Sequence, residues 1–359
     1  MALSPSILTG REPSGAHGSN ASQRIIAAGI VLVFLYYAAE VVMTILLAVL
    51  LAYFLDPVVE WLENRGLPRG LGSLLMVLLV CALLVGAISM LWFRAEDFAS
   101  NWPTYGAKLK AARQAVESRL QSFESRVSEI TPQEQRPRGT LRVEQTESTG
   151  SFLLQKLGSL TNIIVAAAFV PFLVFFMLAA KRDVWHATLQ LFPPAERTQV
   201  KLALEEVGRV LRGYVMGNVL IMVILIIANT IFFWAMGLDY PLLAGTISGV
   251  LNLVPYFGTI LSAIPPLILG MTKWNGAGNY ILVVLMMFAF HFLTLNVLFP
   301  AIVGRRVQLS ALAVTLALLF WGWLWGAMGL LVGIPVTASI KVICDHIEGW
   351  EPVGRWLGA

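Results

Sequence analysis

The chain has 359 residues, of which 57% are hydrophobic and only 13% are charged, and its formal net charge is +4. An average soluble domain carries about 25% charged residues, so this chain lacks the charge needed to cover a water-exposed surface. The small positive excess does not indicate a nucleic-acid partner, and the two cysteines, Cys81 and Cys344, cannot build a disulfide or zinc framework. The composition therefore predicts a polytopic membrane protein.

The N-terminal region raises a question about the number of membrane crossings. Residues 1–23 are rich in Ser, Gly and Ala, and we expect a disordered tail rather than a signal peptide. The apolar block 25–55, interrupted once by Glu40, is too long for one upright span and short for two, because a crossing needs about 20 apolar residues. Keeping Arg11 and Arg24 on the side of the later basic loops requires two crossings with Glu40 near the turn. No Gly or Pro marks such a turn, so the number of crossings in the N-terminal transmembrane region, residues 24–93, stays open.

An extramembrane segment is predicted at residues 94–150, after a span at 71–93. From Tyr105 to Ile130 an apolar stripe with heptad-like spacing follows an otherwise charged helix. The stripe fits a helix lying on its own subunit or on the membrane surface, and it fits a contact between subunits equally well. Its members are Leu109, Val116, Leu120, Phe123, Val127 and Ile130. Residues 151–212 then supply a further span and an amphipathic cytoplasmic helix.

Two later apolar segments are interrupted by helix-breaking residues. The segment 242–271 breaks at Asn252–Gly258, which leaves arms of about 13 residues, or about 20 Å, shorter than the hydrocarbon layer. Proline lacks an amide donor and glycine loosens a helix, so the chain is expected to turn back there. The segment 309–343 is divided in the same way around Trp321–Gly326. We interpret both as helical hairpins, the first of them re-entrant, with an ordinary tight pair of spans as the alternative.

The basic residues near span ends predict the orientation, because cytoplasmic loops are enriched in Lys and Arg. With these residues inside, the span 214–236 runs outward into a hairpin, and the span 280–303 runs inward into a second hairpin. One span plus one hairpin thus occurs twice in opposite senses, which is typical of a transport core with its substrate site near the midplane. We assign this core to residues 213–345 and a cytoplasmic tail to 346–359, with about seven to eight transmembrane helices in all. The basic residues used are Arg65, Arg69, Lys181, Arg182, Arg197, Lys201, Arg209, Arg212, Arg305 and Arg306.

The chemistry of the core excludes several classes of function. Catalytic motifs, a Walker loop and metal-binding clusters are absent from the sequence, so we predict neither an enzyme nor a cofactor or metal site. Between residues 207 and 303 charged side chains occur only at predicted span ends, whereas ion pathways usually retain a carboxylate. His291 could act as a proton-linked switch, or it could be a neutral core histidine.

Neutral polar groups gather in the core instead, which suits an uncharged, hydroxylated solute, although such groups can also simply join helices. The predicted substrate-pathway residues are Asn252, Pro255, Tyr256, Gly258, Thr259, His291, Asn296 and Pro300. The residues predicted to break or pack helices are Pro265, Gly326, Gly329, Gly333 and Pro335.

Several runs resemble motifs of the AI-2E (autoinducer-2 exporter) family of bacterial transporters. In the C-terminal half they are Gly249–Ile260 with Pro265, Asn296–Pro300 leading to Gly304-Arg305, and Gly326–Gly329 followed by Gly333–Pro335. Ala52–Pro57 and Gly66–Gly70 resemble the family's early motif. The chain differs from the family pattern near His291, Ser310 and Trp321. The resemblance implies an oligomeric protein of the bacterial inner membrane. It also implies export of the quorum-sensing signal autoinducer-2, or sodium/proton exchange, since members are linked to both.

We therefore expect an inner-membrane secondary transporter or facilitator that exports a small neutral polar solute similar to autoinducer-2. The expected partners are membrane lipid, the solute and further copies of the chain, with no nucleic acid. The alternatives are a monovalent cation (Na⁺)/proton antiporter, and a non-transporting scaffold that acts through the helix at 105–130.

Overall fold

The computed structural model describes residues 16–130, 168–254, 258–274, 276–303 and 308–358. These residues form helices joined by turns, with no strand among them. Five of the described helices are long and apolar enough to cross a membrane, and shorter apolar helices accompany them. The prediction of an all-α polytopic membrane protein is therefore confirmed.

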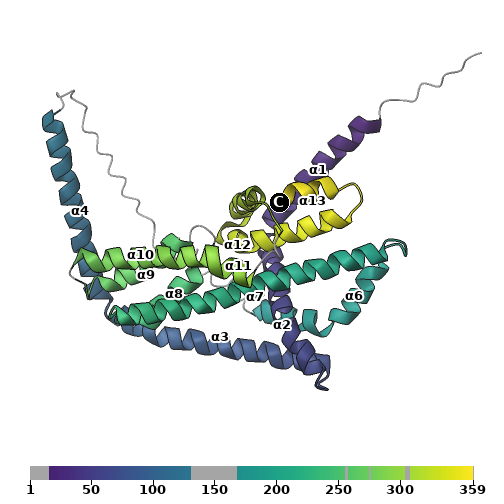
Figure 1. Ribbon diagram of the computed structural model, residues 1–359, viewed down its shortest axis with the longest axis horizontal. Coiled ribbons are helices and arrows are strands. Elements are labelled where there is room, and N and C mark those ends of the chain that lie inside the picture. Colours follow the sequence, from purple (N-terminus) through teal and green to yellow (C-terminus); the bar gives the residue numbers. More distant parts are fainter. Residues whose placement is uncertain (1–15, 131–167, 255–257, 275, 304–307, 359) are drawn as a thin grey trace, which may run out of the picture.

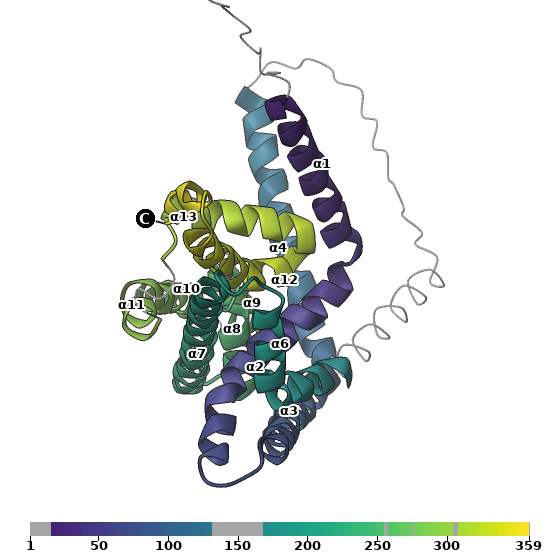
Figure 2. The ribbon, with the colours of Figure 1, turned by 90° about the vertical axis from the view of Figure 1, so that its right-hand side faces the viewer.

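The first helices are α1 (Ala16–Tyr37) and α2 (Ala39–Glu63), which meet at a bend at Ala38. Hydrogen bonds continue through the bend, from the amide of Ala38 to the carbonyl of Phe34 and from the amide of Val42 to the carbonyl of Ala38. The chain therefore keeps its general direction, and α1 extends away from α2 without folding back on it (Figures 1 and 2). The chain therefore does not reverse near Glu40, as two crossings of residues 25–55 would require. Residues 16–23, expected in a disordered tail, are the first turns of α1.

The next helices are α3 (Arg69–Ser100) and α4 (Trp102–Ile130), joined by a turn at Asn101. Helix α4 projects away from the bundle at the end of α3 (Figure 1). Phe98 on α3 packs against Tyr105 on α4, with ring centroids 5.0 Å apart, and this contact fixes the base of α4. Of the apolar stripe predicted on α4, the described side chains include only Leu120, which is exposed. The expected contact between subunits thus lies largely outside the described residues.

The helix Ala168–Ala179 leads through Ala180 into α6 (Lys181–Gln190). A turn then leads to α7 (Arg197–Ala235), which is one unbroken helix of 39 residues. The amphipathic cytoplasmic stretch and the following span were predicted as two units. They form one helix because no Gly-Pro break separates them and the small residues Gly208, Gly213 and Gly217 serve as packing positions, all three being buried.

The C-terminal half consists of helices that pack around α7. Helices α8 (Pro241–Leu251) and α9 (Gly258–Gly270) form one pair, and α10 (Ala277–Leu293), η1 (Thr294–Leu298) and α11 (Phe299–Ile302) follow as a continuous helical segment. Helices α12 (Ala311–His346) and α13 (Glu351–Leu357) complete the chain. A long helix followed by a pair of helical arms therefore occurs twice, α7 with α8 and α9, and α10–α11 with the two arms of α12.

The base of the first pair is closed by contacts between its two ends. The Nζ of Lys273, just after α9, lies 2.7 Å from Oδ1 of Asp239, just before α8. The hydrogen bond to Asp239 and the charge of that carboxylate raise the pKa of Lys273. The indole of Trp274 donates to the carbonyl of Met236 at 3.2 Å. The pair thus begins with α8 and ends with α9 at the same end of α7, as a hairpin requires.

Candidate functional site

The first hairpin reaches the middle of α7 with its tip. Helix α8 runs back along α7 in close contact, because Gly249 faces Ile226 with no room for a side chain: a Cβ there would lie 3.0 Å from the amide nitrogen of Ile226. At the tip, a Cβ on Gly258 would lie 2.7 Å from the carbonyl oxygen of Leu251. Glycine is therefore needed where α9 begins beside the end of α8. Residues 255–257 in the turn itself, including Pro255 and Tyr256, lie outside the described residues.

The second hairpin lies within α12 and turns at Gly326. This residue has φ 62° and ψ −142°, a backbone conformation available essentially only to glycine. The two arms are joined by a buried hydrogen bond of 3.0 Å from the indole of Trp321 to the hydroxyl of Thr337. Gly329 and Gly333 pack directly against Trp321. A Cβ on Gly329 would collide with the carbonyl oxygen of Trp321, and a Cβ on Gly333 would lie only 3.0 Å from its side chain. The expected helix break at Gly326 and the packing of Gly329 and Gly333 follow from these contacts.

Between α10 and α11 the chain forms a short π-helix, η1 (Thr294–Leu298). Such wide turns are rare and often occur at functional sites. The turn places Thr294 inward and buried, whereas Asn296 and Pro300 are exposed. The amide of Asn296 donates to the carbonyl of Phe292 at 2.8 Å.

The hairpins, α7 and the π-helix meet around a cavity of 340 Å³, called here the central cavity. Asn252 and Val254 at the tip of the first hairpin line it, and so do Leu318 and Ile334 from the two arms of the second. Its polar lining comes from Asn218, Asn252, His291 and Thr294, with the hydroxyl of Tyr214 within hydrogen-bonding reach of Asn218. None of the described residues lining the central cavity is Asp, Glu, Lys or Arg.

The predicted pathway residues fall into three groups relative to this cavity. Asn252 and His291 line it. Gly258 and Thr259 are buried beside the hairpin tip, and the Thr259 hydroxyl has no hydrogen-bond partner among the described residues. Asn296 and Pro300 are absent from its described lining and are exposed, so the structure does not bring them together with the others.

Two lining residues, Asn218 and Thr294, were noticed in the sequence as polar core residues but were not selected as pathway residues. Pro265 and Pro335, predicted as break or packing residues, lie within α9 and α12 respectively. The signal that could have found Asn218 is its position on α7, because it lies one helical turn from both Tyr214 and Ile221 and shares their face.

Apolar side chains separate the central cavity from both ends of the bundle. Toward the start of α7, Leu309 packs against two buried clusters, one containing Val210 and the other containing Tyr214 and Ile334. Toward the end of α7, a cluster around Phe233, Leu269 and Val283 fills the space between α7, α9 and α10. Between that cluster and the cavity lies the buried side chain of Asn229, whose Oδ1 lacks a partner within the described part of the chain.

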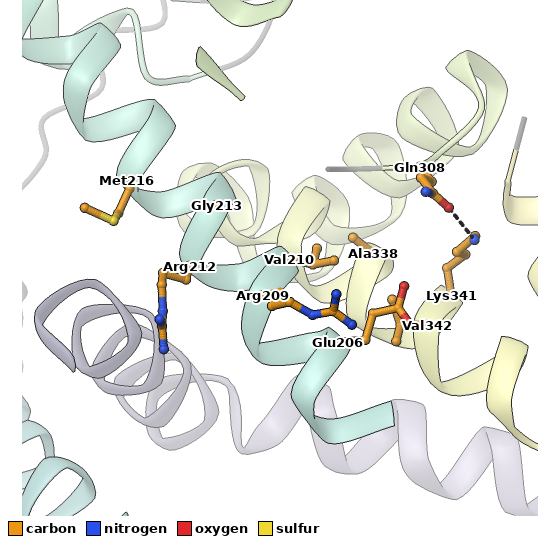
Figure 3. A pocket seen from close by; sticks show the side chains of 10 residues that line it. All are labelled: Glu206, Arg209, Val210, Arg212, Gly213, Met216, Gln308, Ala338, Lys341 and Val342. Atoms are coloured by element: carbon orange, nitrogen blue, oxygen red, sulfur yellow. Dashed lines mark hydrogen bonds between the residues drawn. The ribbon is translucent and has the colours of Figure 1, made fainter. Parts of the chain in front are cut away.

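A second hollow of 480 Å³, called here the vestibule, lies between α7 and α12 (Figure 3). Leu309 lines the central cavity and packs against the cluster of Val210, which lines the vestibule. Val210 and Ala338 line it, each one helical turn from Tyr214 and Ile334 in the central cavity. Its charges are mostly paired. Lys341 contacts Asp345 at 2.5 Å and Gln308 at 3.4 Å, and His346 lies 3.6 Å from Glu206.

A buried ionic network joins α2, α3, α6 and α7 near the vestibule. Asp56, only 1% exposed, accepts hydrogen bonds from Arg69 at 2.8 Å, from Lys181 at 2.6 Å and from Arg212 at 2.8 Å. Arg69 also binds Glu63 and the carbonyl of Leu178. Asp56 was noticed in the sequence only as a titratable group near an interface. Its ion-pair partners lie up to 156 positions away in the chain, so they could not be identified from the sequence.

Comparison with known proteins agrees with this architecture. The sequence profile of the AI-2E family transporters matches residues 25–349. YrrI of Bacillus subtilis (strain 168), which carries a provisional transporter name, is 31% identical over 318 residues, which cover 84% of this chain and 85% of that protein. The AI-2 transport protein TqsA of Escherichia coli (strain K12) is 26% identical over 337 residues, covering 91% of this chain and 92% of TqsA. The chain belongs to the AI-2E family of transporters, as its sequence motifs predicted.

Proposed function

We propose that this chain exports a small, neutral, polar solute similar to autoinducer-2 across the bacterial inner membrane, by way of the central cavity. The observation that carries the proposal is the lining of that cavity. Hydrogen-bonding side chains from α7, the end of α8, α10 and η1 converge there, and its described lining has no formal charge. A charged solute would lose its hydration in such a site without gaining a countercharge, whereas a neutral solute with hydroxyl groups needs only the donors and acceptors present.

The apolar layers on both sides of the cavity support an alternating-access route. In the proposed cycle the solute enters from the vestibule when the layer around Leu309 opens, and leaves when the cluster around Phe233 opens. The tip of the first hairpin and the two arms of the second, which belong to different repeat units, line the cavity. Substrate sites between such units occur in many secondary transporters. Asn229, whose buried oxygen lacks a described partner, marks the continuation of the polar route beyond the cavity.

We place the start of α7 and the C-terminus in the cytoplasm, because the basic residues near the span ends gather on that side. We also infer that the chain works as a homo-oligomer. The solute is suggested by TqsA, whose name describes AI-2 transport. The outward direction is part of our proposal and follows the resemblance to the exporter family. The sodium/proton antiporter alternative gains no support from the cavity, whose described lining has no carboxylate.

The test is the uptake of labelled solute by inverted vesicles whose membrane contains the purified full-length chain. Asn252→Ala removes a cavity donor and acceptor, and we expect solute uptake to fall about tenfold, because a hydrogen bond to a buried polar group is worth about 1–2 kcal/mol. Asn296→Ala is the matched control, since it removes the same side chain from an exposed position outside the described lining.

Uptake equal to that of protein-free vesicles would overturn the proposal, and so would equal losses in the two variants. Sodium-dependent proton flux without solute flux would assign the chain to the antiporter class instead. A panel of neutral and anionic sugars and polyols of similar size defines the accepted solute.

A further inference from the structure

Two adjoining hollows lie between α2, the helix Ala168–Ala179, α6 and α7, on a different face of α7 from the central cavity. One, of 280 Å³, has a mainly apolar wall. The other, of 450 Å³, has a basic wall. Both walls include Tyr53, Lys181, Trp185 and Leu204. Because they share these residues, the hollows are neighbouring compartments of one groove, called here the two-compartment groove.

The apolar compartment is built from aliphatic side chains of three helices. Val49 and Ala52 come from α2, Met177 and Leu178 from the helix Ala168–Ala179, and Val184 from α6. Val184 is 58% exposed, so the compartment is open on the α6 side. An apolar slot of this kind accepts a hydrocarbon chain and offers nothing to a hydrophilic solute.

The basic compartment carries more positive charge than its neighbours neutralise. Lys181, Arg182, Arg209 and Arg212 line it together with one carboxylate, Glu205. Asp56 pairs with Lys181 and Arg212, and Glu63 pairs with Arg182. Counting Arg69, which binds both carboxylates, five cations face three carboxylates.

Two features leave donors available in this compartment. Arg209 has no ion-pair partner within the described ranges. The Nε of Arg212 is buried and finds no acceptor among the described residues. Figure 3 shows that the side chains of Arg209 and Arg212 leave α7 in different directions, and both residues line the vestibule as well as the basic compartment. Guanidinium groups in such positions bind oxygen anions such as phosphate.

The groove also lies where apolar helices end. Lys181 follows the apolar helix Ala168–Ala179 directly, Arg212 precedes the apolar part of α7, and Arg69 begins the apolar helix α3. Trp185 and Tyr53 stand at the junction of the compartments, as amphipathic aromatic residues do at membrane interfaces. An anion held in the basic compartment would therefore lie beside hydrocarbon, which favours one that is covalently attached to an acyl chain.

We propose that the two-compartment groove binds one anionic phospholipid, with its phosphate in the basic compartment and the first methylenes of an acyl chain in the apolar one. Basic pockets between transmembrane helices on the cytoplasmic side recognise anionic headgroups in this way. The lipid would join α6 to α2 and α7 beside the Asp56 network. The proposal does not depend on which solute the central cavity transports.

The experiment is native mass spectrometry of the full-length chain in detergent, titrated with phosphatidylglycerol or with phosphatidylcholine of the same acyl chains. The wild-type chain is expected to retain phosphatidylglycerol in preference to phosphatidylcholine. Arg182→Gln and Arg209→Gln should each lower its apparent affinity about fivefold, since a basic residue near anionic lipid is worth about 1 kcal/mol. Arg355→Gln is the matched control, because Arg355 is exposed at the end of α13, away from the groove.

Val184→Trp tests the apolar compartment separately. It fills the slot and leaves every charge in place, so phosphatidylglycerol retention should fall while the thermal unfolding temperature stays unchanged. Glycerol phosphate, which has the headgroup anion without acyl chains, is expected not to compete at equal concentration.

Each of three results would overturn the proposal. They are equal retention of the two lipids by the wild-type chain, unchanged affinity in both arginine variants, and full competition by glycerol phosphate, which would assign the groove to a soluble anion. Arg182 and Arg209 are exposed, so their variants are expected to fold. The comparison of the two lipids needs no variant at all.

Discussion

The buried hydroxyl of Ser248 on α8 donates a 2.7 Å hydrogen bond to the backbone carbonyl of Ser262 on α9. Within a helix that carbonyl would accept from the amide of residue 266, but residue 266 is a proline and has no N–H. Ser248 therefore satisfies an acceptor that α9 leaves unpaired. The same bond joins the two arms of the first hairpin close to the central cavity.

Ser248→Ala is expected to destabilise the fold by about 1–3 kcal/mol, because it leaves a buried carbonyl without a donor. Thermal unfolding in detergent, followed by tryptophan fluorescence, measures the change. Ser100→Ala is the control, since its hydroxyl donates to the carbonyl of Asp97 at an exposed position. Equal effects of the two substitutions would contradict the role given to Ser248.

Gly326→Ala should destabilise the second hairpin by about 1–3 kcal/mol, because any Cβ is strained at the φ and ψ of this turn. Gly86→Ala, at an open position within α3, should be neutral or slightly stabilising because alanine favours helix. The unfolding temperatures of the two variants give the comparison. If Gly86→Ala lowers the unfolding temperature as much as Gly326→Ala does, the turn geometry is not the cause of the destabilisation.

Asp56→Asn removes the acceptor shared by Arg69, Lys181 and Arg212. Unpairing buried cations is expected to cost about 3 kcal/mol, at the lower end of the range for buried ion pairs because Lys181 and Arg212 are about one-third exposed. The loss of stability should lower the unfolding temperature and speed limited proteolysis between α6 and α7. Asp239→Asn, which breaks the exposed pair with Lys273, should leave both measurements unchanged.

His291→Gln keeps a hydrogen-bonding side chain in the central cavity and removes its titratable group. Because the proposed solute is neutral and its export needs no proton from this histidine, the export rate should stay within about twofold of wild type at each pH tested. Flux at three pH values measures this. Loss of a proton-coupled flux in the variant, with solute binding retained, would instead make His291 the proton carrier.

The sequence predicted the helical class, the two interrupted segments and the family, because long apolar runs and the residues that break them are local signals. The interruption predicted around Trp321–Gly326 contains the turn, and the structure shows that Gly326 makes it, in a conformation that few residues other than glycine adopt. The same holds for Gly258, where the close approach to Leu251 requires a residue without a side chain.

The parts that could not be predicted depend on side-chain direction and on distant contacts. Asn296 was chosen because it lies near a proline, but the π-helix turns it outward and turns Thr294 inward. Asp56 was recognised only as a charge near an interface, since its partners come from three other parts of the chain. The bend at Ala38 had no sequence signal, because alanine is the strongest helix former and does not mark a break.

Helix α7 extends for 39 residues without a break, or about 58 Å at 1.5 Å per residue, nearly twice the thickness of the hydrocarbon layer. Arg212, near the middle of this helix, is held to Asp56 on α2 by a hydrogen bond. Because α7 is one continuous helix, a tilt of the end that carries the first hairpin would move the end that contacts α6 in the opposite direction. We therefore expect movements of the first hairpin and of α6 to be coupled through α7.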